Sequence, residues 1–198
     1  MRWSELWHSG TGLWRRDPAV HQYHFTGYHT SMRVLFLQRH AQAESGAAYT
    51  TDHERELTDG GRRDAEAMGR HMAGIGQFPA HIVSSSAVRT RETCEWMSRG
   101  ANLNDIEVAA TERLYQATPD AVMDEIRSLN GGYGNVLMVG HQPAWGAVIQ
   151  RLTGAQVDMR TGAVACIQLS VRTWSKVKSR SGRLVWFMPP MAVRGNGL

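Results

Sequence analysis

The chain has 198 residues, of which 42% are hydrophobic and 20% charged, a balance that predicts one globular domain rather than a disordered or fibrous chain. The formal net charge is +4, but the basic residues are dispersed except near residues 176–183, where no aromatic residues are interleaved, so we expect no nucleic-acid partner. The two cysteines predict core thiols in a reducing cytoplasm, and no CxxC or other metal-ligand spacing is present.

Residues 1–31 come before the first regular apolar segment. They are rich in Trp, His and Gly, but they lack the continuous apolar stretch of a signal peptide or a membrane span, so we expect no membrane partner. The sequence therefore predicts a poorly ordered N-terminal extension over 1–31, one domain over 32–190, and a C-terminal tail over 191–198.

The first predicted strand, residues 33–38, ends in an arginine–histidine pair. Its apolar run is typical of a buried strand, and open α/β sheets bind their ligands at the carboxyl ends of such strands. His40 is therefore a candidate nucleophile, and Arg39 a candidate anion-binding group. Taken alone, the pair is more typical of ordinary surface residues.

A helix is predicted after Thr58, which can cap its N-terminus. Its inner face consists of Ala65, Met68, Met72 and Ile75. The next strand, residues 81–84, runs into a serine-rich turn and a second helix. The inner face of that helix consists of Ala87, Thr90, Cys94 and Met97.

Arg89 lies in the first turn of this second helix. Cations are stabilised near the C-terminus of a helix rather than its N-terminus. An arginine at this position therefore indicates that an anion binds beside it.

A third strand, residues 135–139, ends in Gly140 and His141 and is followed by Pro143, which suits the first turn of a helix. His141 repeats the position of His40 at a strand end, although capping of the next helix explains this residue equally well when it is taken alone. The remaining predicted elements are a helix over 119–129, a helix over 143–154, and an edge hairpin of strands 163–171 and 183–188.

Three strand ends thus carry cationic or titratable side chains, and a parallel sheet gathers such ends along one edge. The predicted fold is an α/β three-layer sandwich with a mostly parallel central sheet and helices on both faces. Arginine binds phosphate oxygens bidentately, and an unprotonated imidazole can accept a phosphoryl group. The pattern predicts phosphoryl transfer through a phosphohistidine on His40, with Arg39, Arg89 and His141 balancing the charge and no metal or cofactor required.

From residue 32 to about 190, the chain resembles the histidine phosphatase superfamily and, within it, the small SixA-like phosphohistidine phosphatases. Residues 39–41 stand where the superfamily has Arg-His-Gly and SixA-like members often have Ala. Residues 55–61 are similar to its Arg-Pro-Leu-Thr-x-x-Gly, residues 85–93 to its Ser-Pro-x-x-Arg-Ala-x-Gln-Thr, and residues 140–143 to its Gly-His-Asn-Pro. Departures on supporting positions are Glu56, Ser86, Thr90 and Glu92.

The resemblance implies a phosphoglycerate mutase-like fold and a metal-independent phosphatase. Its substrates would be phosphohistidine in a protein partner or small phosphomonoesters. It assigns catalysis to His40, Arg39, Arg89 and His141, and substrate binding to Arg39, Arg89 and Ser85.

A general acid is the missing part of this interpretation. Larger superfamily members supply a glutamate between the second and third motifs, where this chain offers Glu112 and Asp120. Each also has an ordinary structural explanation. Asp120 suits the first turn of a helix, and Glu112 can be a solvated partner of Arg113.

Other functions remain open at this stage. A noncatalytic phosphoprotein-binding module could use the same cationic pocket, and it would tolerate loss of His40, whereas an enzyme would not. A sugar-phosphate phosphatase is a further alternative. A phosphoglycerate mutase is disfavoured because the chain lacks the long insertions that such mutases share, and a serine hydrolase because it lacks a Gly-x-Ser-x-Gly elbow.

Overall fold

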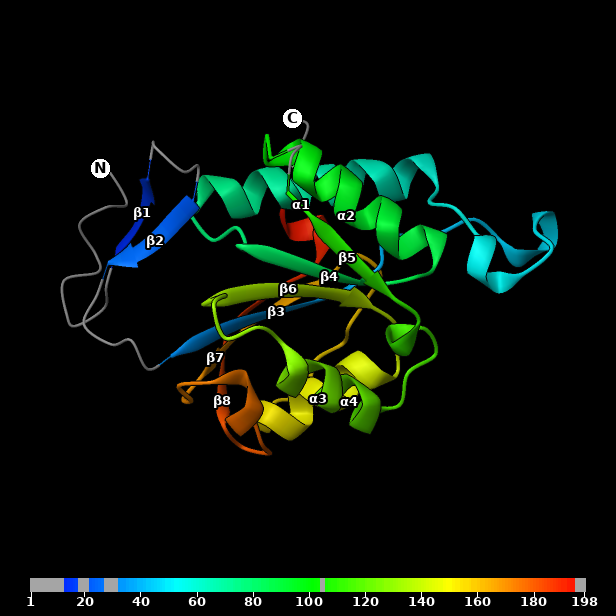
Figure 1. Cartoon of the computed structure of the whole chain (residues 1–198). Coiled ribbons are helices and arrows are strands. Elements are labelled where there is room, and N and C mark those ends of the chain that lie inside the picture. Colours follow the sequence, from blue (N-terminus) through cyan, green and yellow to red (C-terminus); the bar gives the residue numbers. More distant parts are fainter. Residues whose placement is uncertain (1–12, 18–21, 27–31, 104–105, 195–198) are drawn as a thin grey trace.

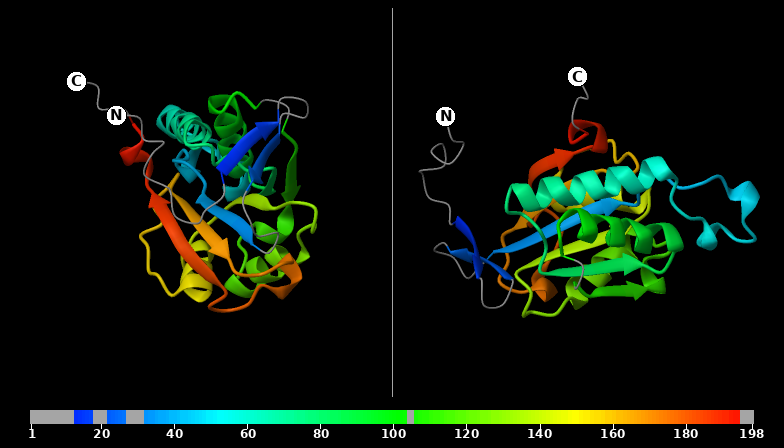
Figure 2. Two further views of the ribbon diagram at one scale, coloured as in Figure 1. Left: turned by 90° about the vertical axis from the view of Figure 1, so that its left-hand side faces the viewer. Right: turned by 90° about the horizontal axis from the view of Figure 1, so that it is seen from above.

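The computed structural model describes residues 13–17, 22–26, 32–103 and 106–194. Its main body is a six-stranded sheet with helices packed against both faces, as the three views in Figures 1 and 2 show. The predicted α/β sandwich is therefore confirmed. Among the helices of these described segments, none is long and apolar enough to cross a membrane.

The sheet is parallel over most of its width. Its strands are β3 (Arg33–Arg39), β4 (His81–Ser85), β5 (Val108–Thr111), β6 (Asn135–Gly140), β7 (Val164–Leu169) and β8 (Gly182–Met188). They lie in the order β5-β4-β6-β3-β7-β8; the first four are parallel, and β7 pairs antiparallel with both β3 and β8. The predicted edge hairpin is thus observed. The short strand β5 was not predicted, because only four residues form it and none of them is fully buried.

Each face of the sheet carries its own apolar core. Helices α1 (Asp59–Gly74) and α2 (Val88–Gly100) cover one face, and α3 (Pro119–Ser128) and α4 (Ala144–Thr153) cover the other (Figure 1). Phe36 of β3 belongs to the core under α1 and α2, whereas Leu35 and Leu37 belong to the core under α3 and α4. Alternation along a strand sends neighbouring side chains to opposite faces, which explains why β3 is apolar throughout.

The predicted helix faces are buried with one exception. Ile75, predicted on the inner face of the first helix, is 45% exposed, so that prediction was wrong. Helix α1 ends at Gly74, and Ile75 has left the helical register as its C-cap. Pro143 also differs slightly from its predicted place, since it is the N-cap of α4 rather than a residue of its first turn.

The two chain ends fall partly outside the described residues. Within 1–31, the structure describes only β1 (Leu13–Asp17) and β2 (Gln22–Thr26), which pair antiparallel and separately from the main sheet. The poorly ordered extension therefore stays a prediction. At the other end, a 3-10 turn forms at Pro190–Ala192, and Arg194 binds the nearly buried Asp64 of α1 through two hydrogen bonds of 2.5 Å. Residues 195–198 of the predicted tail lie outside the described part.

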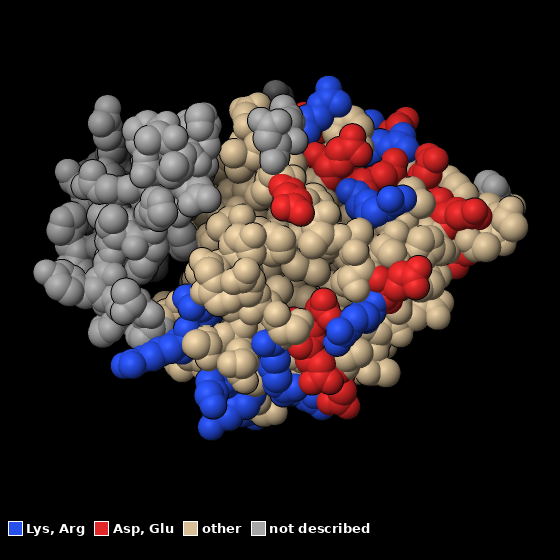
Figure 3. All heavy atoms as spheres, in the orientation of Figure 1, with Lys and Arg blue, Asp and Glu red and all other residues tan. Residues whose placement is uncertain are grey.

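The basic segment near residues 176–183 lies away from the edge where β3, β4 and β6 end. The end of β7, Leu169, pairs with Arg33 at the start of β3, and the segment that leads from β7 to β8 begins there. In Figure 3, Lys and Arg side chains gather at the lower left of the molecule, whereas acidic and basic side chains are mixed elsewhere on that face. The cluster is therefore no part of the predicted pocket.

Helices α1 and α2 approach each other through glycine. A Cβ at Gly69 would lie 2.0 Å from the Met97 carbonyl oxygen, and one at Gly100 would lie 2.0 Å from the Glu66 carbonyl oxygen. Both obstacles are backbone atoms, which cannot rotate away as a side chain can. The separation of the two helices therefore depends on these positions lacking a side chain.

We predict that Gly69→Ala lowers the free energy of unfolding by roughly 1–3 kcal/mol, the usual cost of overpacking a core. Gly74→Ala is a matched control in the same helix, because no atom lies within 4 Å of a Cβ there. It should leave stability unchanged or raise it by up to about 1 kcal/mol, since alanine favours helix over glycine. Denaturant unfolding measures both variants, and a Gly69→Ala protein as stable as the wild type would contradict the close approach.

Candidate active site

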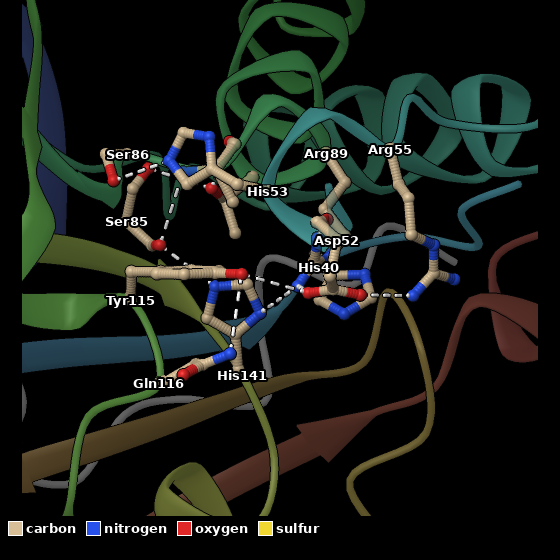
Figure 4. Close-up of polar contacts among 12 residues, drawn as sticks. His40, Asp52, His53, Arg55, Ser85, Ser86, Arg89, Tyr115, Gln116 and His141 are labelled. Carbon is tan, nitrogen blue, oxygen red and sulfur yellow. Dashed lines mark hydrogen bonds and ion pairs between the residues drawn. The ribbon is translucent and has the colours of Figure 1, made fainter. Parts of the chain in front are cut away.

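Two histidines follow strands that pair in parallel. Arg39 lies opposite Gly140 in the β3–β6 register, and the His40 backbone N–H donates to the Gly140 carbonyl oxygen at 3.0 Å. The imidazole centroids of His40 and His141 are consequently 5.2 Å apart. Arg89 reaches the same place from the first turn of α2, which follows β4, the other neighbour of β6. Figure 4 shows the three side chains together.

The hydrogen bond of His40 defines which ring nitrogen is free. Nδ1 lies 2.7 Å from the Ala41 carbonyl oxygen, which can only accept, so Nδ1 carries the proton and donates. The neutral ring then has its lone pair on Nε2. Burial lowers the pKa of His40 to about 4, helped by the positive charges of Arg89, Arg39 and Arg55. At neutral pH, His40 therefore presents an unprotonated Nε2, as a nucleophile requires.

His141 is also held in one tautomer. A guanidinium can only donate, so Nδ1 of His141 accepts from Arg89 Nη2 at 3.4 Å, and Nε2 donates to the Ser85 hydroxyl at 2.9 Å. Burial lowers its pKa to about 3, helped by the charges of His40 and Arg89 and opposed by that of Asp52. In the structure, Ser85 thus orients His141, whereas the sequence had placed it among the substrate-binding residues.

Arg39 contributes charge from the end of β3. Its Nη1 donates to the Met159 carbonyl oxygen at 3.1 Å, while its buried Nε has no hydrogen-bond partner among the described residues. Burial lowers its pKa, and the charge of Asp158 opposes that shift. The Arg39 charge lowers the pKa of both His40 and His141, so the four predicted catalytic residues form one electrostatic group.

The carboxylate that reaches this group is Asp52, which sequence reasoning did not single out. Asp52 lies in the 3-10 turn Asp52–Glu54, on the segment between β3 and α1. Its Oδ2 accepts from Arg89 Nη2 at 2.9 Å and from the Tyr115 hydroxyl at 3.2 Å, and its Oδ1 accepts from Arg55 Nη1 at 2.8 Å. The hydrogen bond from Arg55 contributes most to lowering the pKa of Asp52 to about 2. The sequence offered one indication of this role, since Asp52 comes three residues before Arg55, the first residue of the motif at 55–61.

Aromatic rings line one side of the same pocket. Tyr115 meets His141 edge-to-face with centroids 5.8 Å apart, and it meets His53 in the same way at 4.8 Å. His53 Nε2 in turn lies 2.9 Å from the Ser86 hydroxyl oxygen. These side chains, which Figure 4 shows together, come from segments that are far apart along the chain, which is why no local sequence pattern indicates the wall.

The two proposed general acids lie in different surroundings. Asp120 is exposed at the start of α3, where it pairs with Arg151 Nη1 at 2.5 Å, and this hydrogen bond and charge lower its pKa. A general acid needs a raised pKa instead. Glu112 is exposed in the 3-10 turn Glu112–Leu114. The acid role of either residue stays a prediction, and neither is among the groups whose charges shift the histidines.

Backbone hydrogen bonds connect the site to its supporting elements. The Ala41 N–H donates to the Thr93 hydroxyl oxygen at 3.0 Å, which holds the chain after His40 against α2. The Leu57 N–H donates to the Glu92 carboxylate at 2.5 Å, and Arg62 donates to the same carboxylate. Glu92, a departure from the family motif, thus anchors the end of the segment that carries Asp52.

Comparison with known proteins is consistent with this geometry. The model of the histidine phosphatase superfamily (branch 1) matches residues 35–117. An uncharacterized protein of Mycobacterium leprae is 29% identical over 165 residues, which cover 77% of this chain and 99% of that protein.

Two solved structures extend the comparison to the fold. The protein assigned as phosphohistidine phosphatase SixA of Nakamurella multipartitia is 27% identical, with a TM-score of 0.67 over 81% of this chain and 98% of that one. A protein histidine phosphatase SixA complexed with tungstate is 22% identical, with a TM-score of 0.70 over 81% and 99% of the two chains, and shows the shared fold.

Fold and site define an α/β protein with a cluster of arginine and histidine side chains at the carboxyl edge of its parallel strands. Residues 35–117 match the model of the histidine phosphatase superfamily (branch 1), and proteins named SixA are among the structural neighbours of the chain. The predicted resemblance and the phosphoglycerate mutase-like fold are both confirmed.

The lowered pKa of His40 predicts an unusual titration. An ordinary histidine gains its proton near pH 6.5, whereas the His40 ring should stay neutral as the pH falls from 7 and gain its proton only near pH 4. Because protonation removes the Nε2 lone pair, the nucleophile is lost below that pH and not at 6.5. NMR of labelled histidine side chains measures this, with the signal assigned by its absence in His40→Ala. A midpoint near 6.5 would contradict the burial argument.

Proposed function

We propose that this protein is a phosphatase that hydrolyses phosphohistidine in a protein partner, or small phosphomonoesters with good leaving groups, through a phosphohistidine on His40. The observation that carries the proposal is the His40 tautomer: Nδ1 donates to the Ala41 carbonyl oxygen, so the neutral Nε2 is available to attack phosphorus. The match of residues 35–117 to the histidine phosphatase superfamily model and the SixA-like structural neighbours support phosphatase activity.

The reaction takes place in two displacements. In the first, Nε2 of His40 forms a bond to phosphorus while the bond from phosphorus to the leaving group breaks. In the second, water attacks the same phosphorus, inorganic phosphate leaves, and the neutral imidazole is restored. Nδ1 keeps its proton throughout, hydrogen-bonded to the Ala41 carbonyl oxygen, so no other group has to remove a proton from the ring.

Charge stabilisation comes from the guanidinium groups. Phosphoryl transfer spreads negative charge over three equatorial oxygens, and preorganised donors stabilise it. Arg39 and Arg89 each have a buried Nε without a partner in the described part of the chain, so both retain donors for those oxygens. In this proposal these groups supply the positive charge that metal ions supply elsewhere, and the enzyme works without a metal or cofactor in the cytoplasm.

The ionisation of Asp52 and Asp120 favours substrates with good leaving groups, because neither carboxylate carries a proton for the leaving group. An alkoxide leaves only with a proton, whereas a phosphohistidine that is protonated on its other nitrogen releases a neutral imidazole. Asp52, with a pKa of about 2, is ionised at neutral pH, and Arg151 lowers the pKa of Asp120. Neither residue holds a proton to donate, which favours phosphohistidine over sugar phosphates.

A noncatalytic phosphoprotein-binding module is the second candidate. The same cations would bind a phosphoryl group without transferring it. The free Nε2 of His40 has no purpose in such a module, and this is the observation that favours an enzyme.

We predict a covalent intermediate on His40. Acid-labile, base-stable label should remain on the protein after brief exposure to a labelled aryl phosphate and denaturing quench, because phosphoimidazoles have that stability profile. His40→Ala should abolish both label and turnover. His71→Ala, which changes a histidine in the last turn of α1, is the matched control and should keep both.

Undiminished label on His40→Ala would overturn the nucleophile assignment. Binding of a phosphorylated partner that survives in His40→Ala, together with a wild type that shows no label and no turnover, would instead identify the binding module.

We also predict a strong dependence on the leaving group. The wild type should act on phosphohistidine peptides and aryl phosphates at least about a hundredfold faster than on alkyl phosphates, since a general acid is typically worth 10²–10⁴ in rate. Asp120→Asn and Glu112→Gln should leave both rates within about twofold. The measurement is kcat/KM on matched aryl and alkyl esters. A selective loss on the alkyl ester in either variant would show that its carboxyl group is the acid.

A further inference from the structure

Both terminal nitrogens of the Arg89 guanidinium are already occupied in the protein. Its Nη1 donates to the backbone carbonyl oxygen of Asp52 at 2.5 Å, and its Nη2 donates to Oδ2 of the same residue at 2.9 Å. Arg89 is only 6% exposed at its side chain, so it has little freedom to turn to another partner. A phosphoryl group could therefore bind both terminal nitrogens of Arg89 only if their hydrogen bonds to Asp52 were broken.

The Asp52 carboxylate receives the contacts that a bound oxyanion would receive. Three donors converge on its two oxygens: Arg89 and Tyr115 on Oδ2, and Arg55 on Oδ1. They come from α2, from the loop after the 3-10 turn Glu112–Leu114, and from the segment that carries Asp52 itself. Figure 4 shows the carboxylate between Tyr115 and Arg55, in front of His40. Planar, charge-assisted hydrogen bonding of this kind is also how arginines hold phosphate.

The segment that carries Asp52 lies between Ala43 and Leu57, and it is held more firmly at these two ends than between them. A bridge between Ala43 and Leu57 closes the base. Beyond the bridge, the segment meets the rest of the site through contacts of Asp52 with Arg89 and Tyr115 and through contacts of His53 with Ser86 and Tyr115. The Asp52 side chain is 47% exposed. In Figure 1 this cyan segment extends past the edge of the sheet, and its 3-10 turn Asp52–Glu54 contains no buried residue, so an outward shift of the turn would expose no core side chain of its own.

We propose that Asp52 is an internal occupant of the phosphoryl site and that the substrate's phosphoryl group binds by displacing it from Arg89. The two anions cannot share the site, because both require the same donors of Arg89 and because their negative charges repel. Displacement leaves Arg89, Arg55 and Tyr115 with free donors that face the incoming group. Asp52 thus lowers the affinity of the site for every anion that has to displace it. The identity of that anion as a phosphoryl group rests on the proposed function.

Oxyanion affinity tests the proposal without requiring turnover. Titration calorimetry would measure the Kd of tungstate and of inorganic phosphate for the wild type, Asp52→Asn and Asp52→Ala. Both variants should bind at least about tenfold more tightly, because they lack the internal competitor. Asp124→Asn is the matched control: it removes the charge of another exposed aspartate that is paired with an arginine, Arg127, on α3. Its Kd should change by less than about twofold, as expected for a screened surface charge.

Unchanged or weaker binding in both Asp52 variants would overturn the proposal, since it would mean that the carboxylate only orients Arg89. If neither variant folds, hydrogen exchange of the wild type decides. Saturating tungstate should speed exchange of the backbone amides of residues 51–55, although ligands usually slow exchange, and unchanged or slower exchange there would refute displacement.

The two proposals can fail separately. Tighter tungstate binding in the Asp52 variants, with no label on His40 in any protein, would refute the phosphatase and leave displacement standing. Label on His40, with no gain in tungstate affinity in the Asp52 variants, would support the phosphatase and refute displacement.

Discussion

The parallel pairing of β3 with β6 is the constraint on which the site depends. It places Arg39, the last residue of β3, beside Gly140, the last residue of β6. A histidine follows each of them, so the two rings meet at one edge of the sheet. Gly140 has to lack a side chain, because a Cβ there would lie 2.1 Å from the Trp145 ring. A shift of one residue in this register would send each side chain to the opposite face and separate the two imidazoles.

The pocket concentrates positive charge while its two imidazoles remain neutral. The cations around the rings disfavour their protonation, and burial does the same, so both pKa values fall. The result is a region with three guanidinium groups and nucleophilic nitrogen, in which Asp52 is the balancing anion. A site with this balance attracts oxyanions and protects its nucleophile from protonation by the same charges.

The departures from the family motif have structural partners in this chain. Ser86, where the motif has proline, contacts His53 of the segment that carries Asp52. Thr90, where the motif has alanine, donates to the Ser85 carbonyl oxygen at 2.8 Å. Glu92, where the motif has glutamine, binds the Leu57 N–H and Arg62. The contact of Thr90 is local, whereas those of Ser86 and Glu92 connect the start of α2 to the segment that carries Asp52, a link that one sequence cannot display because these partners lie far apart along the chain.

By itself, the sequence was sufficient to predict the fold class, five of the six strands of the main sheet, and the convergence of His40, Arg89 and His141. Apolar periodicity and strand-end positions are local patterns, and a parallel sheet converts them into proximity. It could not predict the helix end that exposes Ile75, nor the short strand β5, whose few half-exposed residues have no distinct pattern. The Asp52 carboxylate on Arg89, the tautomer of each histidine and the pairing of Asp120 with Arg151 were decided only by the tertiary structure. The His40 tautomer depends on a hydrogen bond to the carbonyl oxygen of the neighbouring Ala41, and the other features depend on hydrogen bonds between side chains that are distant in sequence; the geometry of all these bonds exists only once the chain has folded.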